Sequence, residues 1–180
     1  MIKNVRAGLR DGKSKLVADY FSMSYASAKT FKYFTDSVIL GANFQQSFLD
    51  FKTIGNLTST MTGSSLAMYL SGEVRGPVRH LRSSKLVVSS KSGNTFLSLG
   101  NVKVDGLPNA KNTIISADVN NCNTTGNDLA EIIASIYNSP KIEFLQNLTP
   151  FTKYNFSGTV KGKFDDLFAA GELSSSVGTL

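Results

Sequence analysis

The side chains best suited to chemistry are scarce in this sequence. Cys122 is the only cysteine and His80 the only histidine among 180 residues. One cysteine cannot form an internal disulfide or a Cys-x-x-Cys metal site, and one histidine excludes a His-rich zinc site. We therefore expect no metal ion and no other cofactor.

Three short patterns suggest chemistry, and each has a simpler interpretation. Gly12-Lys13-Ser14 resembles the end of a phosphate-binding loop, but the first glycine of that motif would fall at Ala7. His80 follows Arg79 beside a turn, where a solvated side chain is expected rather than a member of a Ser-His-Asp triad. Asp165-Asp166 pairs two carboxylates, as a cation site would, but also suits a turn. The sequence thus predicts no catalytic site and no enzyme.

Composition points to a folded, mildly basic chain. The apolar fraction is 41%, which is enough to bury a core. The net charge is +6, but the basic residues are spread along the chain rather than clustered, so a solvated surface is expected. Aromatic side chains can stack nucleic-acid bases. Most of those here lie in strands whose other face is polar, which favours a role in a core or groove and no nucleic-acid partner; they are Phe31, Phe44, Phe48, Phe51, Phe96, Tyr154 and Phe156.

One pattern occurs twice. Leu70-Ser71-Gly72-Glu73-Val74-Arg75-Gly76 returns as Phe156-Ser157-Gly158-Thr159-Val160-Lys161-Gly162, and a leucine follows at Leu81 and Leu167. The positions equivalent to Asp165-Asp166 in the first copy are Arg79-His80, so paired acidity is not part of the repeated unit. A repeat of this kind predicts two related β units, which we place at about 16–105 and 106–180 within a single segment.

Alternating apolar and polar residues predict an antiparallel meander. We predict strands at 16–25, 36–44, 49–51, 66–74, 86–90, 95–105, 113–120, 154–161 and 167–177. Turns are expected at Gln45-Gln46, Ser92–Asn94 and Gly106–Asn109, a helical turn or aromatic loop at 26–36, and a loop at 55–64. One helix is expected near 127–137, capped by Thr125 or Asn127, with an apolar stripe of Leu129, Ile132, Ile133 and Ile136.

The fold class is therefore mainly β, with a long twisted antiparallel sheet curved into an open trough and one short helix. Gly72 and Gly158 fall on the apolar face of their strands, where a missing side chain permits the sheet to bend. The apolar face supplies candidate residues for a groove that binds lipid chains: Leu66, Met68, Leu70, Val74, Phe96, Val102, Val104, Ile115, Val119, Tyr154, Phe156 and Val160.

The ordered set of motifs from Tyr69 to Leu180 resembles the C-terminal region of translocation-and-assembly-module B (TamB) proteins, within the AsmA-like group of diderm bacterial envelopes. The matching motifs are Leu70–Gly76, Gly106–Thr113, the helix at Asp128–Ile136, and Phe156–Leu173.

The resemblance implies a segment of a longer envelope protein that is anchored in the inner membrane and crosses the periplasm. Its apolar groove would carry phospholipid acyl chains between the two membranes, and the full-length protein would support outer-membrane assembly and protein secretion through a barrel partner. The chain departs from the family pattern in lacking the N-terminal anchor and the extreme C-terminal region, so contact with the barrel is in question for this segment. No signal peptide is expected at its start, and no apolar run approaches the roughly 20 residues of a membrane helix.

Two other classes of protein remain open at this point. A structural or adhesive β-sandwich would bury the same apolar faces against a second sheet. An enzyme on a β-barrel or cupin-like fold would need a polar cleft. A strand left at an open edge also predicts edge-to-edge self-association.

Overall fold

The protein is described by a computed structural model, which describes residues 7–11, 14–50, 67–109, 112–137, 153–163, 166–176 and 178–179. Within these residues ten strands form one sheet, and their order in the sheet follows their order in the sequence. Neighbouring strands are antiparallel throughout. The strands are β1 (Ala7–Asp11), β2 (Ser14–Ser24), β3 (Ile39–Asp50), β4 (Ala67–Gly76), β5 (His80–Ser90), β6 (Phe96–Asp105), β7 (Ile114–Thr124), β8 (Tyr154–Lys163), β9 (Asp166–Ser175) and β10 (Gly178–Thr179).

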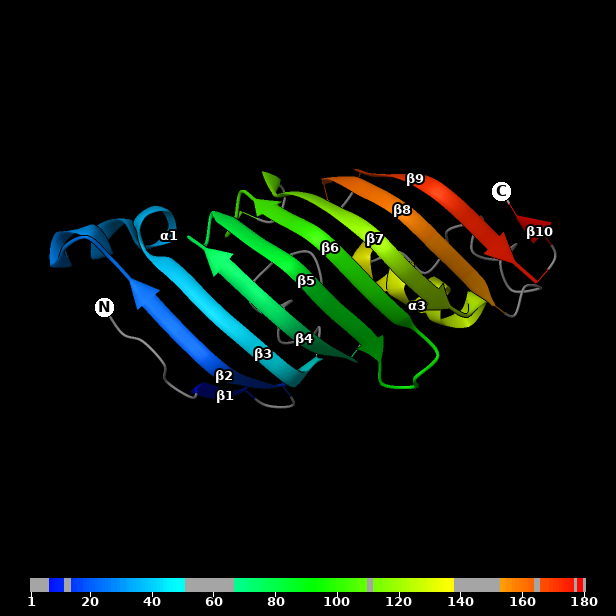
Figure 1. Cartoon of the computed structure of the whole chain (residues 1–180), viewed down its shortest axis with the longest axis horizontal. Helices are drawn as coiled ribbons and strands as arrows, with labels where there is room; N and C mark the ends of the chain where they lie inside the picture. Colours follow the sequence, from blue (N-terminus) through cyan, green and yellow to red (C-terminus); the bar gives the residue numbers. More distant parts are fainter. Residues whose placement is uncertain are drawn as a thin grey trace.

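Three helical elements of the described residues accompany the sheet. A 3-10 helix, η1 (Ala28–Tyr33), and a single turn of α-helix, α1 (Phe34–Ser37), join β2 to β3 at one end of the sheet (Figure 1). The helix α3 (Gly126–Tyr137) follows β7 and lies behind the sheet in the view of Figure 1. These positions match the predicted helical turn and the predicted helix.

The predicted fold class is confirmed as a mainly β, antiparallel meander with one short helix. The described strands make a single open, uncurled sheet rather than two facing sheets, so the closed sandwich is not the fold of this part of the chain. The predicted loop at 55–64 lies outside the described residues.

The predicted turn at Gln45-Gln46 is wrong, because β3 continues through it. Between the pairs Phe44↔Gly72 and Ser47↔Leu70, β3 advances three residues while β4 advances two. One extra residue in one strand of a pair is a β-bulge. Residues 44 and 47 consequently face the same side of the sheet although they are an odd number of positions apart.

Similar bulges interrupt β2, β5, β6 and β7. In β6 the bulge lies at Gly100-Asn101, and Asn101 has a φ of 48°, a left-handed conformation that asparagine tolerates better than most residues. β5 begins at His80 rather than at the predicted Leu86. The prediction missed this part of the strand because the bulge lies there and the residues between His80 and Leu86 do not alternate regularly.

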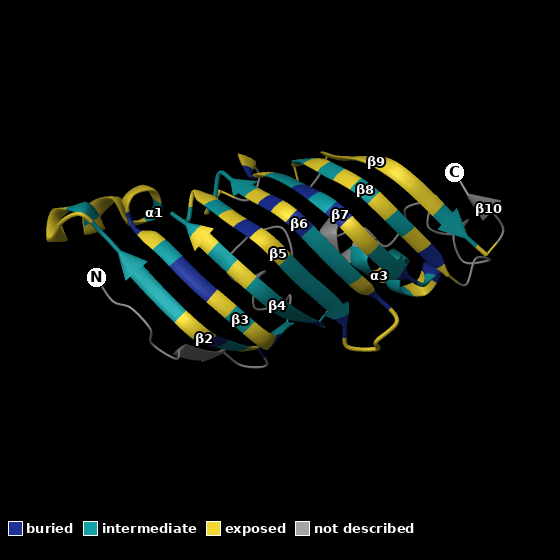
Figure 2. Cartoon of the chain, viewed as in Figure 1, coloured by how far each residue is buried: buried dark blue, intermediate teal, exposed yellow. Residues whose placement is uncertain are grey.

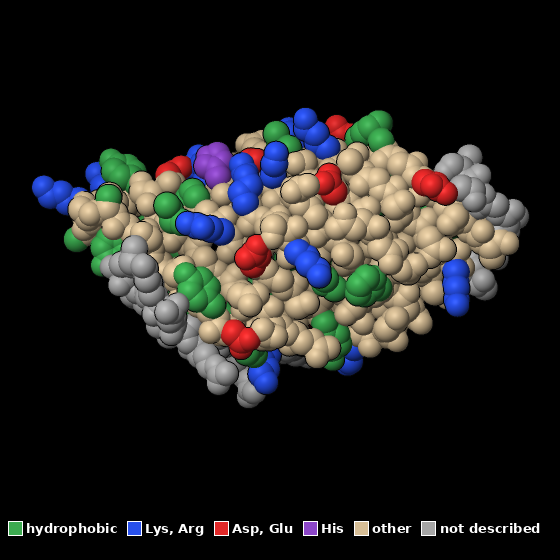
Figure 3. All heavy atoms as spheres, viewed as in Figure 1, with side chains coloured by type: hydrophobic (Ala, Val, Ile, Leu, Met, Phe, Trp, Pro, Cys, Tyr) green, Lys and Arg blue, Asp and Glu red, His purple; other side chains and the backbone are tan. Residues whose placement is uncertain are grey.

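The two faces of the sheet differ in chemistry. We call one the apolar face, and it includes Leu70, Val74, Leu86, Val88, Leu97, Leu99, Val119, Phe156 and Val160. We call the other the polar face, and it includes Tyr20, Asn43, Glu73, Arg75, Asn101, Lys103, Asp118, Thr159 and Lys161. Figure 3 views the face opposite α3, where charged side chains of both signs are scattered.

Full burial is confined to a few positions, as expected for a single layer of sheet. Val38, Ala117 and Val119 are among the buried apolar residues, whereas most of the apolar face is half-buried (Figure 2). Every residue of β9 from Asp166 to Leu173 is exposed. The open edge therefore carries the largest continuous exposed stretch of strand in the described chain.

The two repeated motifs adopt the same backbone conformation. Gly72 in β4 and Gly158 in β8 have φ values of 129° and 156°. A Cβ atom at Gly72 would lie 2.2 Å from the carbonyl oxygen of Lys85, and one at Gly158 would lie 2.2 Å from that of Ala170. Both glycines thus allow the next strand to approach closely, and the division into two units built around them stays a prediction.

Candidate functional site

Cross-strand register builds the apolar face into a continuous surface. Val88 of β5 lies between Leu70 of β4 and Leu97 of β6, and Leu97 is in turn opposite Cys122 of β7. Phe156 of β8 follows in the same row. Directly opposed side chains in an antiparallel pair have Cβ atoms about 4.5–5.5 Å apart, so these residues form one contiguous apolar row.

Most of the predicted groove-lining residues share this face. They are Met68, Leu70, Val74, Val102, Val104, Ile115, Val119, Tyr154, Phe156 and Val160. Leu66 lies outside the described residues. Met68, Val102, Val119 and Tyr154 are buried, and the others are half-buried.

Phe96 is not on the apolar face, and its predicted place beside Val102 and Val104 is wrong. It is opposite Ser89 and Asn123 on the polar face and is 39% exposed. The bulge at Gly100-Asn101 shifts the alternation by one residue. Even-numbered residues before the bulge, such as Phe96, therefore face the opposite side from even-numbered residues after it, such as Val102.

A partly buried polar cluster ties the start of α3 to the turn between β5 and β6. Asp128 Oδ2 accepts hydrogen bonds from Thr95 Oγ1 at 2.8 Å and from Ser92 Oγ at 3.0 Å. Thr95 Oγ1 also contacts Thr124 Oγ1 at 2.8 Å, and both threonines are buried. Thr125 caps the helix as predicted, because its Oγ1 accepts from the backbone N–H of Asp128 at 3.3 Å.

Opposing effects act on the pKa of Asp128. Burial raises this pKa, but hydrogen bonds from Thr95, Ser90, Ser92 and Asn94 stabilise the carboxylate and together hold the pKa below its ordinary value. The cluster positions α3, and no sequence pattern indicates it, because its members are far apart in the chain.

His80 belongs to an exposed charge cluster rather than to a catalytic triad. Its Nδ1 lies 2.7 Å from Asp105 Oδ1, and Arg82 donates to the same oxygen at 2.7 Å. Burial is the largest single effect on the pKa of Asp105 and raises it, but hydrogen bonds and charge from His80 and Arg82 together outweigh burial and lower the pKa. A histidine whose carboxylate is shared with an arginine, with no hydroxyl or thiol among its described contacts, supplies no activated nucleophile.

Cys122 is equally unsuited to nucleophilic chemistry. Its side chain is half-buried on the apolar face, and burial raises the pKa of the thiol. The reactive species of cysteine is the thiolate, so the raised pKa disfavours the reactive form at neutral pH.

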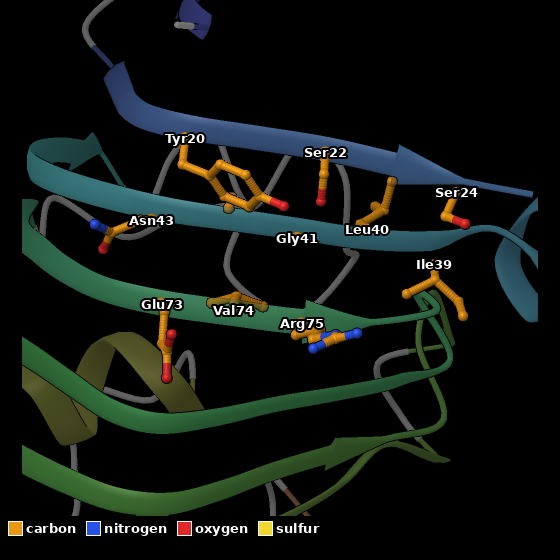
Figure 4. Close-up of a pocket in the computed structure, with 11 residues that line it drawn as sticks. Tyr20, Ser22, Ser24, Ile39, Leu40, Gly41, Asn43, Glu73, Val74 and Arg75 are labelled. Carbon is orange, nitrogen blue, oxygen red and sulfur yellow. The ribbon is translucent and has the colours of Figure 1, made fainter. Parts of the chain in front are cut away.

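The polar face carries a shallow depression of about 380 Å³ over β2, β3 and β4. Gly41 forms part of its floor, and Tyr20, Asn43, Glu73 and Arg75 surround it (Figure 4). These groups can hydrogen-bond a polar molecule. They include no paired acid and base at a reacting position, and Glu73 is already engaged by the hydroxyl of Ser84.

Within the described part of the chain, no three His, Cys, Asp or Glu side chains gather as metal ligands. Nor is any described helix long and apolar enough to cross a membrane. Comparison with protein-family models, with curated proteins and with solved structures finds no match for the chain. The apolar face is therefore the candidate functional site on physical grounds.

Proposed function

We propose that the chain is a non-enzymatic segment of a TamB/AsmA-like envelope protein whose apolar β-surface binds and carries lipid acyl chains. The observation that carries the proposal is the apolar face itself. It runs without a charged residue through the row of Leu70, Val88, Leu97, Cys122 and Phe156 and is half-buried rather than closed.

Hydrocarbon chains match such a surface better than polar ligands do. Burial of a methylene group contributes about 0.8 kcal/mol, so an acyl chain gains affinity from contact area alone and needs no fixed hydrogen-bonding site. The scarcity of catalytic side chains agrees with this role. In the full-length protein we place the segment in the periplasm, between the inner and outer membranes, with an outer-membrane barrel as partner.

Two adjacent residues of β5 provide a test with a matched control. Val88 and Val87 are both half-exposed, but Val88 lies on the apolar face between Leu70 and Leu97, while Val87 lies on the polar face between Ser71 and Ser98. Val88→Asp should displace bound acyl chains, because desolvating a carboxylate costs several kcal/mol. Val87→Asp should leave binding unchanged.

Binding would be measured by native mass spectrometry and lipid extraction of the purified chain, and by titration with a fluorescent fatty acid. We expect Val88→Asp to weaken fatty-acid binding about tenfold or more, since each 1.4 kcal/mol is one factor of ten. Circular dichroism of both variants would show whether the sheet is retained. The proposal fails if the unmodified chain binds no lipid, or if both variants lose binding equally while remaining folded.

A further inference from the structure

The outer edge of β9 is an open strand with the features of a pairing surface. Among the described residues, the stretch from Asp166 to Leu173 pairs with β8 on one side, and on the other side β10 pairs only with Ser174 and Ser175. Leu167 is 41% exposed and Phe168 is 71% exposed. Natural edges are commonly protected by lysine or proline, and β9 contains neither.

We propose that this edge pairs antiparallel with β9 of a second copy of the chain, with Ala170 on the two-fold axis. A two-fold axis perpendicular to the sheet keeps the apolar faces of both copies on the same side. In that arrangement each residue pairs with a residue that points to the same face of the sheet. One residue at the centre must then pair with its own copy, so the axis passes at a residue of the strand and not between two successive residues. The midpoint of the free stretch lies between Ala169 and Ala170. The registers centred on these two residues therefore pair most of the stretch.

Charge and packing select the register centred on Ala170. There, Leu167 lies opposite Leu173 of the second copy on the apolar face, and this contact occurs twice. Phe168 lies opposite Glu172 of the second copy, so no like charges meet.

Centring on Ala169 would instead place Asp166 opposite Glu172 of the second copy, twice. Directly opposed like charges are destabilising. That register would also leave Leu173 without an apolar partner, whereas the register centred on Ala170 joins the apolar faces of two sheets into one surface.

The dimer is expected to be modest in affinity. One pair of strand edges buries less than the roughly 1,200–2,000 Å² typical of stable interfaces. The mass in solution should therefore rise with concentration from 19.4 kDa towards twice that value over the micromolar range.

Cysteine cross-linking tests the register directly, in a Cys122→Ser background that removes the native thiol. Residues directly opposed across an antiparallel pair have Cα atoms about 4.5–5.5 Å apart, which suits a disulfide. Ala170→Cys should therefore form an intermolecular disulfide under mild oxidation, and Ala169→Cys should not. Cross-linking of both variants, of neither, or of Ala169→Cys alone would overturn the proposal.

A charge exchange supplies the second measurement, read as mass by light scattering. Leu173→Lys alone should give a monomer, and Leu167→Glu combined with Leu173→Lys should restore the dimer through two Glu–Lys pairs. Ile114→Lys is the control, because Ile114 is 44% exposed at the start of the interior strand β7. Dissociation by the control, failure of the double variant to dimerise while folded, or a monomer at every concentration of the unmodified chain would each refute the pairing. Pairing of β9 with a strand of a different protein, in place of a second copy, would also refute the proposal.

Discussion

Alanine at Gly72 is expected to destabilise the sheet strongly, because two separate costs act there. The φ of 129° is rarely adopted by residues with a side chain, and a left-handed or otherwise strained backbone costs about 1–3 kcal/mol. The new Cβ would also lie 2.2 Å from the carbonyl oxygen of Lys85 and 3.1 Å from Cα of Leu86. The clash is with backbone, so rotation of a side chain cannot relieve it.

The second cost follows from the movement that the clash requires. Strands β4 and β5 must separate by roughly 1 Å at this point, which weakens neighbouring backbone hydrogen bonds worth about 0.5–1.5 kcal/mol each. With two such bonds weakened, the sum is about 2–6 kcal/mol, a large part of the roughly 5–15 kcal/mol that stabilises a typical domain.

Gly93 provides the matched control. Its φ of 79° is also positive, but a Cβ there would meet no atom within 4 Å. Gly93→Ala should therefore cost only the backbone strain, about 1 kcal/mol. Urea unfolding followed by circular dichroism would measure both variants, after the transitions are shown to be two-state.

The difference between the two variants reports the close approach of β5 to β4 together with any greater backbone strain at a φ of 129° than at 79°. If Gly72→Ala costs no more than Gly93→Ala, the close approach does not constrain the sheet and the reasoning is wrong. Gly158→Ala repeats the experiment in the second motif, where Cβ would lie 2.2 Å from the oxygen of Ala170 and 2.6 Å from Cα of Gly171. Similar losses at Gly72 and Gly158 would support the equivalence of the two copies.

Two further predictions concern charged groups. The pKa of Asp128 is lowered in the folded state, so its contribution to stability is present above the ordinary pKa of aspartate, about 3.9, and is lost as pH falls through the folded value. Asp128→Asn should accordingly lower the free energy of unfolding by about 1–2 kcal/mol at pH 7 and by progressively less towards pH 2, measured by urea unfolding at each pH; an equal loss at both ends of that range would contradict the assignment. Asp105→Asn, at an exposed cluster with His80 and Arg82, should cost less than about 1 kcal/mol, and a larger loss in the same assay would show that this cluster is structurally important.

The sequence predicts the elements of this fold better than their faces. The cap at Thr125, the hairpin turn at Ser92–Asn94 and the turn at Gly106–Asn109 are local signals, and all three are present. Strand continuity through Gln45-Gln46 is not local. It depends on pairing with β4, which is distant in the sequence. Taken alone, Gln45 and Gln46 interrupt the alternation of apolar residues and therefore resemble a turn.

Prediction of the candidate site likewise succeeds where a strand is regular and fails where tertiary structure decides. Met68, Leu70 and Val74 are assigned to one face correctly because β4 is regular between them. Phe96 is misassigned because the prediction extended one parity through a bulge in β6. The polar cluster around Asp128 gives no signal at all, since hydrogen bonds between a turn and a distant helix depend only on tertiary structure.

The bulges also explain how the apolar face stays continuous. In β6, apolar residues occur at Leu97 and Leu99 and then at Val102 and Val104, so their parity changes at Gly100-Asn101. Register places all four on one face, which requires the extra residue to be accommodated on the other.

The same reasoning applies in β3, β5 and β7, where the bulged pairs are Gln45-Gln46, Ser84-Lys85 and Asn120-Asn121. Each pair is polar, so each extra side chain reaches solvent without burial of an unpaired polar group. A change in the parity of apolar positions across two polar residues is therefore a sequence signal for a bulge in this sheet. A turn would reverse the direction of the chain and would be supported by glycine or proline, which these pairs lack. In this protein the bulges keep these pairs of polar residues off the surface that we propose to bind acyl chains.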